Sequence, residues 1–378
     1  MIYLVKKLIF KNNDKVEDVY SFIEDLNRLN YDYLLVEGDA YSDEDKEHFF
    51  HSIIEISSLS EIPVLIKFPI THFEDMKKLY YANAVKIIAS EGTNVDNSVI
   101  EEGVKRYGNN LVISSDEFDK KSIVLGSFDE LDPDYLTEKE EFYVCDESDR
   151  LEEVASLKSG LADKGFDVKA LKPMILWDDL KKNSDGLVPV IVLDYRTDKL
   201  LMMAYMNEEA YYNTFKTGLM SYYSRSRKEQ WIKGETSGHF QFVKSMKADC
   251  DLDTLVAYVS QIGVPCHTGK DTCFFNDVLV NDNKSKNPAK ILDDLYKVIE
   301  DRKANPKEGS YTNYLFDKGL DKILKKVGEE ACEIVIASKN EEPKEIKYEI
   351  ADFLYHLSVL MVEKGVSWEE VATELANR

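Results

Sequence analysis

Three cysteines and three aspartates form the densest group of potential metal ligands in the chain. They lie in two short segments, ADCDLD (248–253) and PCHTGKDTC (265–273). Three cysteines are too few for a closed four-ligand structural zinc site, whereas three protein ligands and one open position are typical of catalytic zinc. His267, which follows the second cysteine, could be a fourth ligand, a general base or neither. The cysteines are Cys250, Cys266 and Cys273.

The aspartates Asp249, Asp251 and Asp253 alternate with other residues around Cys250. On an extended strand, a period of two places all three carboxylates on one face. Like charges this close repel one another, so the pattern predicts a hard cation such as Mg²⁺. Each cysteine alone could be a small buried hydrophobe, and each aspartate alone a turn residue. The joint pattern favours metal.

A local basic segment, SRSRKEQWIKGETSGH (224–239), precedes these ligands. Its cations could neutralise a phosphate, and its glycines and serines leave backbone amides free to approach an anion. Because the whole chain carries 48 Lys and Arg against 71 Asp and Glu, a net charge of −23, such a segment stands out. It predicts a phosphate site, with a solvated turn as the alternative.

Carboxylates also recur along two apolar stretches near the C-terminus, GEEACEIV (328–335) and YEIADFLYH (348–356). Their acids are three or four residues apart and therefore share one helical face. Carboxylates that face a bundle interior are costly unless they are paired or bound to metal, and facing helices build divalent-metal sites in this way. Surface ion pairs with nearby lysines are the alternative. Two acidic pairs on adjacent helices favour metal.

Residues 1–172 alternate short apolar runs with amphipathic stretches, which is typical of βα units around a parallel sheet. The pattern is similar to half of a (β/α)₈ barrel, with the phosphoribosyl-isomerase barrels as the nearest likeness. We expect a non-catalytic domain used for packing or assembly. Strands are predicted near 33–38, 62–67, 85–89, 110–114, 122–127 and 142–146, with a helix near 148–164.

Residues 173–282 are rich in Gly, Ser, His and Cys and predict a small, mostly-β domain. VPVIVLDY (188–195) and LLMMAYM (200–206) predict a hairpin, and 240–253 a further strand. NDNKSKNP (281–288) reads as a polar linker. Residues 288–378 predict an all-α domain, with helices over 319–337, 344–364 and 367–378 and Ser367 as the last N-cap.

Ordered motifs of the middle domain resemble phosphoribosyl-AMP cyclohydrolase: VIVLDYRTDKLLMMAYMNEEA, YYSRSRKEQWIKGETSGH, DCDLD and PCHTGKDTCFF. The resemblance implies zinc on the three cysteines and magnesium on the three aspartates. The family's zinc site is similar to one shared between two subunits, so a homodimer is also implied. The candidate catalytic residues are His267, His239, Lys233 and Glu235, and the candidate substrate-binding residues are Arg225, Arg227, Lys228, Trp231 and Ser237.

The segment SYTNYLFDKGLDKILKKVGEEACEIVIASKN resembles phosphoribosyl-ATP pyrophosphatase, of the all-α group that includes MazG-type enzymes. The resemblance implies a helical bundle that holds Mg²⁺ against a triphosphate, with Lys322 and Lys326 as candidate phosphate contacts. The implied magnesium ligands are Glu329, Glu330, Glu333, Glu349 and Asp352.

The charge and the hydropathy of the chain argue against two further classes of protein. The acidic balance argues against a nucleic-acid-binding protein, and no apolar run approaches the roughly 18 residues of a membrane helix. MIYLVKKLIF has no signal-peptide cleavage site, so we expect a cytoplasmic chain. Together, the two resemblances imply a bifunctional hydrolase that releases pyrophosphate from phosphoribosyl-ATP and then opens the adenine ring of phosphoribosyl-AMP. The alternatives are a general nucleotide-triphosphate pyrophosphatase and a zinc-stabilised binding scaffold.

Overall fold

The computed structural model describes residues 1–11, 13–38, 42–90, 97–108, 112–126, 130–131, 141–147, 154–279, 290–340 and 342–376. The chain forms two compact units, Met1–Val278 and Leu279–Arg378. The division falls beside the predicted linker, whose residues 281–288 lie outside the described residues. The predicted boundary at residue 173 lies within the first unit.

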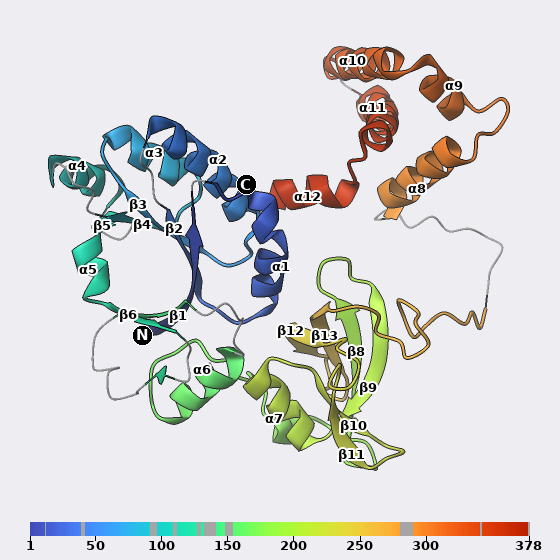
Figure 1. Cartoon of the computed structure of the whole chain (residues 1–378). Coiled ribbons are helices and arrows are strands. Elements are labelled where there is room, and N and C mark those ends of the chain that lie inside the picture. Colours follow the sequence, from blue (N-terminus) through green and yellow to red (C-terminus); the bar gives the residue numbers. More distant parts are fainter. Residues whose placement is uncertain are drawn as a thin grey trace. The chain divides into compact units, whose positions relative to one another are not determined.

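A seven-stranded, all-parallel sheet occupies the N-terminal part of the first unit (Figure 1). Its strand order is β5-β4-β3-β2-β1-β7-β6, so the chain winds round from β1 to β5 and returns through β7 to the other side of β1. This is the neighbour order of a (β/α) barrel. The strands are β1 Ile2–Phe10, β2 Tyr33–Gly38, β3 Val64–Pro69, β4 Lys86–Ser90, β5 Val112–Ser114, β6 Ser122–Leu125 and β7 Phe142–Asp146.

The sheet is strongly curved, because strands that are far apart in its order meet across its inner face. Nζ of Lys86 on β4 donates to the hydroxyl of Tyr143 on β7 at 2.8 Å, although β3, β2 and β1 lie between these strands in the sheet. Tyr143 also packs against Tyr3 and Tyr33, with ring centroids 5.4 and 6.2 Å apart. The predicted fold class, a barrel-like α/β domain, is therefore correct, but the sheet has seven strands, which is more than half of an eight-stranded barrel.

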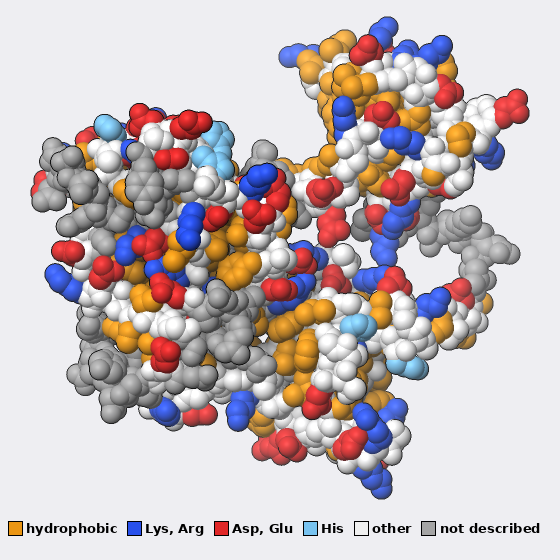
Figure 2. Space-filling view, in the orientation of Figure 1, with side chains coloured by type: hydrophobic (Ala, Val, Ile, Leu, Met, Phe, Trp, Pro, Cys, Tyr) orange, Lys and Arg blue, Asp and Glu red, His pale blue; other side chains and the backbone are white. Residues whose placement is uncertain are grey.

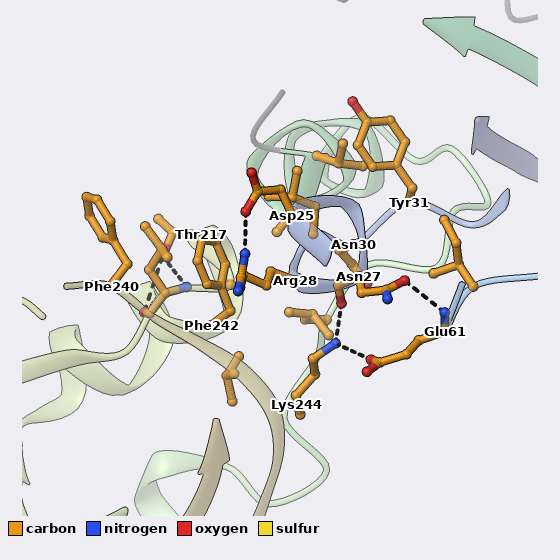
Figure 3. A pocket seen from close by; sticks show the side chains of 18 of the residues that line it. Asp25, Asn27, Arg28, Asn30, Tyr31, Glu61, Thr217, Phe240, Phe242 and Lys244 are labelled. Carbon is orange, nitrogen blue, oxygen red and sulfur yellow. Dashed lines mark hydrogen bonds and ion pairs between the residues drawn. The ribbon is translucent and has the colours of Figure 1, made fainter. Parts of the chain in front are cut away.

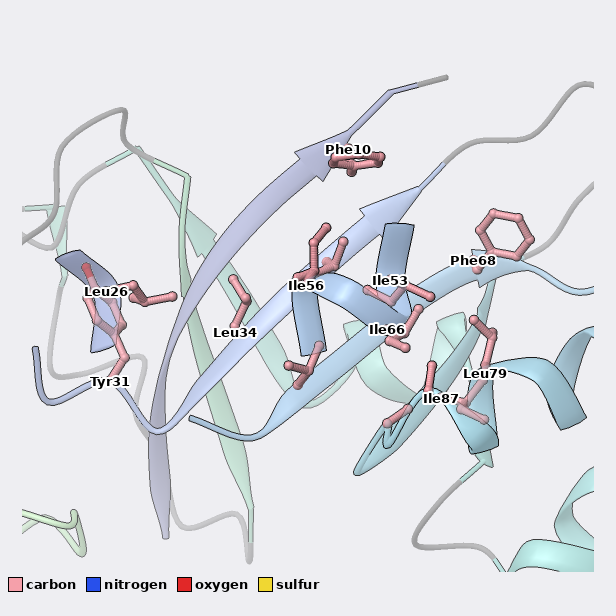
Figure 4. Close-up of a cluster of buried hydrophobic side chains, with 14 of the residues drawn as sticks. Phe10, Leu26, Tyr31, Leu34, Ile53, Ile56, Ile66, Phe68, Leu79 and Ile87 are labelled. Atoms are coloured by element: carbon pink, nitrogen blue, oxygen red, sulfur yellow. The ribbon is translucent and has the colours of Figure 1, made fainter. Parts of the chain in front are cut away.

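Helices cover the outer face of this sheet and bury a second apolar layer that includes Leu34, Ile53 and Ile66 (Figure 4). Leu34 on β2 and Ile66 on β3 alternate with the inner-face side chains of their strands, whereas Ile53 comes from a covering helix. Both faces of the sheet are therefore buried, as parallel sheets require. The helices of this part are η1 Val16–Val19, α1 Tyr20–Arg28, α2 Asp43–Leu59, α3 Phe73–Tyr81, α4 Asn97–Tyr107, α5 Ser115–Asp119 and α6 Val154–Asp163.

Strand β1 was not among the predicted strands, because Lys6 and Lys7 interrupt its apolar run. The structure neutralises the two lysines on opposite faces. Lys6 is fully buried with Nζ 2.6 Å from Asp146, while Lys7 Nζ lies 2.5 Å from both Glu37 and Glu147. A lysine inside a parallel sheet is tolerated only when a carboxylate meets it.

A four-stranded mixed sheet, in the order β12-β13-β8-β9, forms the middle part of the first unit. β8 and β9 are antiparallel neighbours, which confirms the predicted hairpin. A separate hairpin, β10–β11, carries the basic segment at its turn. The elements are η4 Trp177–Asp179, β8 Val188–Asp194, β9 Leu200–Met206, α7 Glu208–Thr217, β10 Ser221–Ser224, β11 Glu229–Ile232, β12 Gln241–Ala248 and β13 Leu255–Gln261.

The two parts of the first unit meet around the carboxylate of Glu61, which Arg196 and Lys244 contact at 2.8 and 3.1 Å and Tyr195 also hydrogen-bonds. Burial opposes ionisation of Glu61, but these donors prevail and lower its pKa. A cavity of about 540 Å³ beside this contact is lined from both parts, including Arg28 and Phe242 (Figure 3). Ion pairs thus join the barrel-like part to strand β12, through Lys244, and to the turn between β8 and β9, through Arg196.

Every regular element among the described residues of the second unit is a helix, as predicted. Its longest helices, α10 and α11, lie against each other. Ser367 caps α12 as expected, with its Oγ accepting from the amide of Glu370 at 3.2 Å. In the described part of the chain, no helix has the length and hydropathy to span a membrane. The helices are α8 Ile291–Ala304, α9 Tyr311–Lys318, α10 Leu320–Ala337, α11 Pro343–Lys364 and α12 Trp368–Ala376.

Candidate active sites

Cys266 and Cys273 lie together in the loop that follows β13. The Cys266 thiol is in hydrogen-bond contact with Cys273, and its Sγ is 3.0 Å from Oγ1 of Thr268. The bond with Thr268 lowers the pKa of Cys266, whereas burial raises the pKa of Cys273. The amide of Cys273 donates to the carbonyl of Leu201 on β9 at 2.8 Å, which fixes the loop against the sheet. The Cys266 thiol therefore ionises at a lower pH than the Cys273 thiol.

Lys233 faces this thiol pair from the end of β11. It is 8% exposed, and burial lowers its pKa while the charges of Cys273 and Cys266 act to raise it. Gly234 allows the chain to turn here: its φ is +96°, and a β-carbon would come within 2.4 Å of the Phe240 amide nitrogen. The turn therefore requires glycine, because the backbone beside Lys233 lies directly against the backbone of His239 and Phe240.

His239 is held in one orientation by the segment that leads to Cys266. Its Nδ1 lies 2.9 Å from the carbonyl oxygen of Val264. A carbonyl can only accept, so Nδ1 carries a proton in this contact and the neutral ring keeps its lone pair on Nε2. The ring also lies against the backbone of Gly263. The structure thus ties His239, a predicted catalytic residue, to the cysteine loop.

The other predicted residues of this site lie on exposed turns. His267 and Glu235 are both exposed. Within the part of the chain that the structure describes, no hydrogen bond joins either side chain to the thiol pair. Ser237 Oγ accepts from the amide of His239 at 3.3 Å.

The basic segment forms the turn between β10 and β11. Arg225 stacks over Tyr205, with its guanidinium 4.0 Å from the ring centroid, and Arg227 pairs with Glu229 at 3.2 Å. Lys228 occupies the turn with a φ of +56°. Trp231 packs on Tyr222 inside the domain, with centroids 4.9 Å apart. Two of the three predicted cations therefore already have partners within the domain.

The three aspartates come together by a route that differs from the prediction. Strand β12 ends at Ala248, and the residues that follow form a turn in which Leu252 has a φ of +64°. Asp249 Oδ1 accepts from the amides of Asp253 and Thr254 at 3.0 and 3.2 Å, and these bonds outweigh desolvation and lower its pKa. Ligand oxygens of Asp249, Asp251 and Asp253 lie within 4.8 Å of one another. The expectation of an extended strand was wrong, because the turn's amide bonds to Asp249 replace strand pairing.

Cys250 is exposed on this same turn, where its Sγ lies 3.9 Å from a carboxylate oxygen of Asp251. Among the described residues, no three potential ligands that include a cysteine lie within 4.8 Å of one another. Within one chain, therefore, Cys250 does not complete a three-thiol cluster with Cys266 and Cys273.

In the helical unit, ligand oxygens of Glu330, Glu333 and Glu349 lie within 4.8 Å of one another. Desolvation raises the pKa of Glu349, and its hydrogen bond with Glu333 raises it further. Three carboxylates at this separation repel unless a proton or a cation lies between them. Asp352 adds its negative charge to Glu349 without joining the group.

Ion pairs account for the remaining acid of the predicted set. Glu329 lies 3.4 Å from Lys325 and 2.9 Å from Lys326, and Lys326 also reaches Glu330 at 3.6 Å. These are the contacts that the alternative of simple ion pairs predicts for Glu329. Lys322, the other predicted phosphate contact, is half-buried on α10.

Sequence reasoning missed two residues beside this cluster, Tyr311 and His356. Nε2 of His356 lies 3.1 Å from the Tyr311 hydroxyl, and its Nδ1 lies 3.5 Å from a carboxylate oxygen of Glu330. His356 is only 5% exposed. A histidine one helical turn after Asp352, on the acidic face, was the available signal.

Two family models match this chain in the regions of the two sites. The model for phosphoribosyl-AMP cyclohydrolase matches residues 202–275, and the model for phosphoribosyl-ATP pyrophosphohydrolase matches residues 292–378. The first contains the thiol pair with Lys233 and His239, and the second contains the helical carboxylates. The chain is therefore a hydrolase with two different hydrolytic modules.

The chain is also similar to curated proteins that are named as bifunctional. The histidine biosynthesis bifunctional protein HisIE of Thermoanaerobacter pseudethanolicus is 50% identical over 209 residues, which cover 52% of this chain and 97% of the relative. The proteins of that name from Lactococcus lactis and Bacillus subtilis are 51% and 46% identical, over 51% and 53% of this chain and 88% and 95% of their own lengths. The chain belongs to the family of bifunctional HisIE proteins of histidine biosynthesis.

Proposed function

We propose that the helical unit hydrolyses phosphoribosyl-ATP to phosphoribosyl-AMP and pyrophosphate, and that the middle domain then opens the adenine ring of phosphoribosyl-AMP in a zinc-dependent hydrolysis. The observation that supports this most directly is that each matched module contains its own cluster of potential metal ligands. We place this chemistry in the cytoplasm, and we infer that the helical unit follows the MazG-type arrangement.

In the helical unit, Glu330, Glu333 and Glu349 would hold Mg²⁺, since carboxylate oxygens are its preferred ligands. Burial, the hydrogen bond with Glu333 and the charges of the neighbouring carboxylates all raise the pKa of Glu349, which fits a site that needs a cation. When bound, Mg²⁺ neutralises phosphate charge. Lys326, between Glu329 and Glu330, adds a fixed positive charge at the same edge. We keep Glu329, Asp352 and Lys322 in the proposed set, as residues that flank this core on α10 and α11.

In the middle domain, Cys266 and Cys273 would supply two zinc ligands. When bound in a site with an open position, zinc lowers the pKa of a water molecule to about 7. Water adds to C6 of the purine, the N1–C6 bond breaks and the water oxygen becomes a carbonyl oxygen, so the water loses both protons: the first as it adds to C6, and the second as the bond breaks and N1 gains a proton. His239, with a lone pair on Nε2, is our candidate to take the first, and His267 and Glu235 are candidates for the second.

The remaining groups of this site would bind substrate or a second metal. Lys233 brings a partly desolvated cation to the thiols, where it would attract an anionic substrate. Arg225, Arg227 and Lys228, with Ser237 and Trp231 beside them, are the proposed phosphate and base contacts. Asp249, Asp251 and Asp253 form the proposed magnesium site.

The third zinc ligand leads us to propose a homodimer. Cys250 is exposed and lies outside the thiol pair, so a second copy would bring its Cys250 to Cys266 and Cys273. Figure 2 shows hydrophobic side chains gathered on the surface of the helical unit. The apolar side chains that this unit leaves uncovered include Val335, Ile336 and Tyr348, which are 63%, 67% and 66% exposed. A monomer rarely leaves such side chains grouped on neighbouring helices.

A mixing experiment tests the shared zinc site. Cys250→Ser and Cys266→Ser should each abolish ring opening, whereas co-refolded mixtures should regain up to about a quarter of the wild-type sites, since half the dimers are mixed and each restores one of its two sites. A mixture as inactive as its components would contradict the shared site.

The proposed reactions are tested by adding phosphoribosyl-ATP to the full chain and following products by ultraviolet absorbance and chromatography. Two successive products, phosphoribosyl-AMP and then its ring-opened form, are expected. Comparable turnover of dUTP or dCTP would instead favour a general nucleotide pyrophosphatase, and no turnover of any of them would favour a binding scaffold.

A further inference from the structure

The hydrogen bonds of His356 define the direction of a tyrosine hydroxyl beside the helical carboxylates. Nδ1 of His356 lies 2.9 Å from the main-chain carbonyl oxygen of Asp352. Because that oxygen can only accept, Nδ1 carries a proton, and the neutral imidazole keeps its lone pair on Nε2. The Tyr311 hydroxyl, 3.1 Å from Nε2, is then the donor. Its oxygen lone pairs are left for other partners.

The oxygen of Tyr311 lies within the field of charged groups that belong to the candidate magnesium site. Burial raises the pKa of Tyr311, Lys326 lowers it, and Glu330 raises it again, so both charges reach this hydroxyl. Glu330 is itself 3.5 Å from His356. The tyrosine is 45% exposed whereas the histidine is 5% exposed. Tyr311 is thus a partly exposed residue whose hydroxyl is linked through the buried His356 to Glu330 of the carboxylate cluster.

We propose that Tyr311 accepts a hydrogen bond from the attacking water in the pyrophosphate-releasing reaction, and that His356 is a positioning residue that directs the Tyr311 hydroxyl. The inference rests on the proposed function of the helical unit. In the step concerned, the water oxygen forms a bond to phosphorus while the bond from that phosphorus to the bridging oxygen breaks. The bridging electron pair leaves with pyrophosphate, and one water proton passes to a carboxylate of the cluster.

The orientation matters because a hydroxyl that is free to rotate offers its lone pair or its proton at random. A water that is bound at the wrong angle reacts more slowly, because catalysis depends on the orientation of the bound reactants. A misplacement of about 1 Å can lower the rate 100-fold. Tyr311 would thus act on the rate of the bound complex more than on its formation. No metal ligand is removed by changing it.

The test is steady-state kinetics of pyrophosphate release by the full chain. Tyr311→Phe should lower kcat by about 10- to 100-fold with KM changed less than about twofold. His356→Asn, which lacks an acceptor at the Nε2 position, should lower kcat similarly, whereas His356→Gln, whose amide oxygen can reach that position, should restore part of it. The double variant Tyr311→Phe with His356→Asn should be no slower than the worse single variant, because both act through one hydroxyl.

Tyr314→Phe is the matched control, since Tyr314 stacks on Tyr311 at 6.1 Å from the same helix and should leave kcat unchanged. Ring opening of phosphoribosyl-AMP by the same preparations checks that the chain is intact. Wild-type kcat in Tyr311→Phe, an effect on KM alone, or multiplicative losses in the double variant would overturn the inference. If Glu330→Gln abolishes release while Tyr311→Phe does not, only this inference fails; if the wild type releases no pyrophosphate, both fail.

Discussion

The backbone of Gly263 lies directly against the imidazole of His239: a β-carbon at position 263 would come within 2.7 Å of the ring carbon Cδ2. We therefore expect Gly263→Ala to displace His239 and lower the ring-opening rate while pyrophosphate release is unchanged. Gly263 has a φ of +59°, so alanine also costs about 1 kcal/mol of backbone strain. Gly186→Ala is the control, because Gly186 has a φ of +73° with open space around it. Equal ring-opening rates in both variants would show that His239 does not act in ring opening.

The thiol pair gives a second prediction. Cys266→Ser should lose bound zinc and ring opening while pyrophosphate release continues, because the two activities are assigned to separate units. Zinc content by atomic absorption and both rates should be measured on one preparation. Cys332→Ser, which changes an exposed cysteine on α10, is the control and should keep its zinc. Wild-type ring opening in Cys266→Ser would refute the zinc assignment.

The raised pKa of Glu349 predicts a pH dependence. Because the folded chain holds this proton more tightly than the unfolded chain, the group's contribution to stability falls as pH rises from the ordinary glutamate pKa of 4.5 through the raised pKa. Glu349→Gln should remove that decline and, at neutral pH without metal, raise the melting temperature of the helical unit. Glu349→Gln should also abolish the rise in melting temperature that Mg²⁺ produces in the wild type.

Calorimetric scans at several pH values, with and without Mg²⁺, measure this, and Glu300→Gln on α8 is the control. A Glu349→Gln variant that melts lower than the wild type at neutral pH without metal would show that the three carboxylates do not repel. An unchanged response to Mg²⁺ would show that Glu349 is not a ligand.

The buried pair of β1 and β7 predicts a large loss of stability. Asp146→Asn breaks the buried ion pair with the Lys6 ammonium, which costs about 3–5 kcal/mol in the free energy of unfolding. Asp167→Asn, which removes a 73% exposed partner of the N-terminus, should change it by less than about 0.5 kcal/mol. Urea titration followed by near-ultraviolet circular dichroism compares them. Similar losses in both variants would mean that the buried pair contributes no more than a surface pair.

The barrel-like part should be dispensable for chemistry, since both family matches lie in residues 202–378. A chain that begins at Pro173 loses the contacts of Glu61 with Arg196 and Lys244, which are partly exposed ion pairs of small net value. We expect it to retain both activities. Loss of both in a truncated chain that circular dichroism shows to be folded would assign this part a catalytic role.

The sequence predicted those elements whose periodicity matches their burial. The helix expected over 319–337 is α10, Leu320–Ala337, and the hairpin of β8 and β9 has the expected partners. Strand β1 was not predicted, because Lys6 and Lys7 break its apolar pattern. These lysines are tolerated in the strand only because the folded chain places Asp146, Glu37 and Glu147 beside them.

At the sites, residue types were easier to predict than their grouping. The aspartates meet through a turn that depends on the positive φ of Leu252, which alternation cannot indicate. Likewise, the contact of Tyr311 with His356 joins residues 45 positions apart. Such contacts are set by helix packing, and no local pattern encodes them.

The most direct test of two separate metal-dependent sites is to strip the full chain with chelator and add phosphoribosyl-ATP. We predict no product from the stripped chain, phosphoribosyl-AMP and pyrophosphate alone when Mg²⁺ is restored, and the ring-opened product only when zinc is restored as well. Turnover of both compounds at the full rate by the metal-free chain would contradict the account.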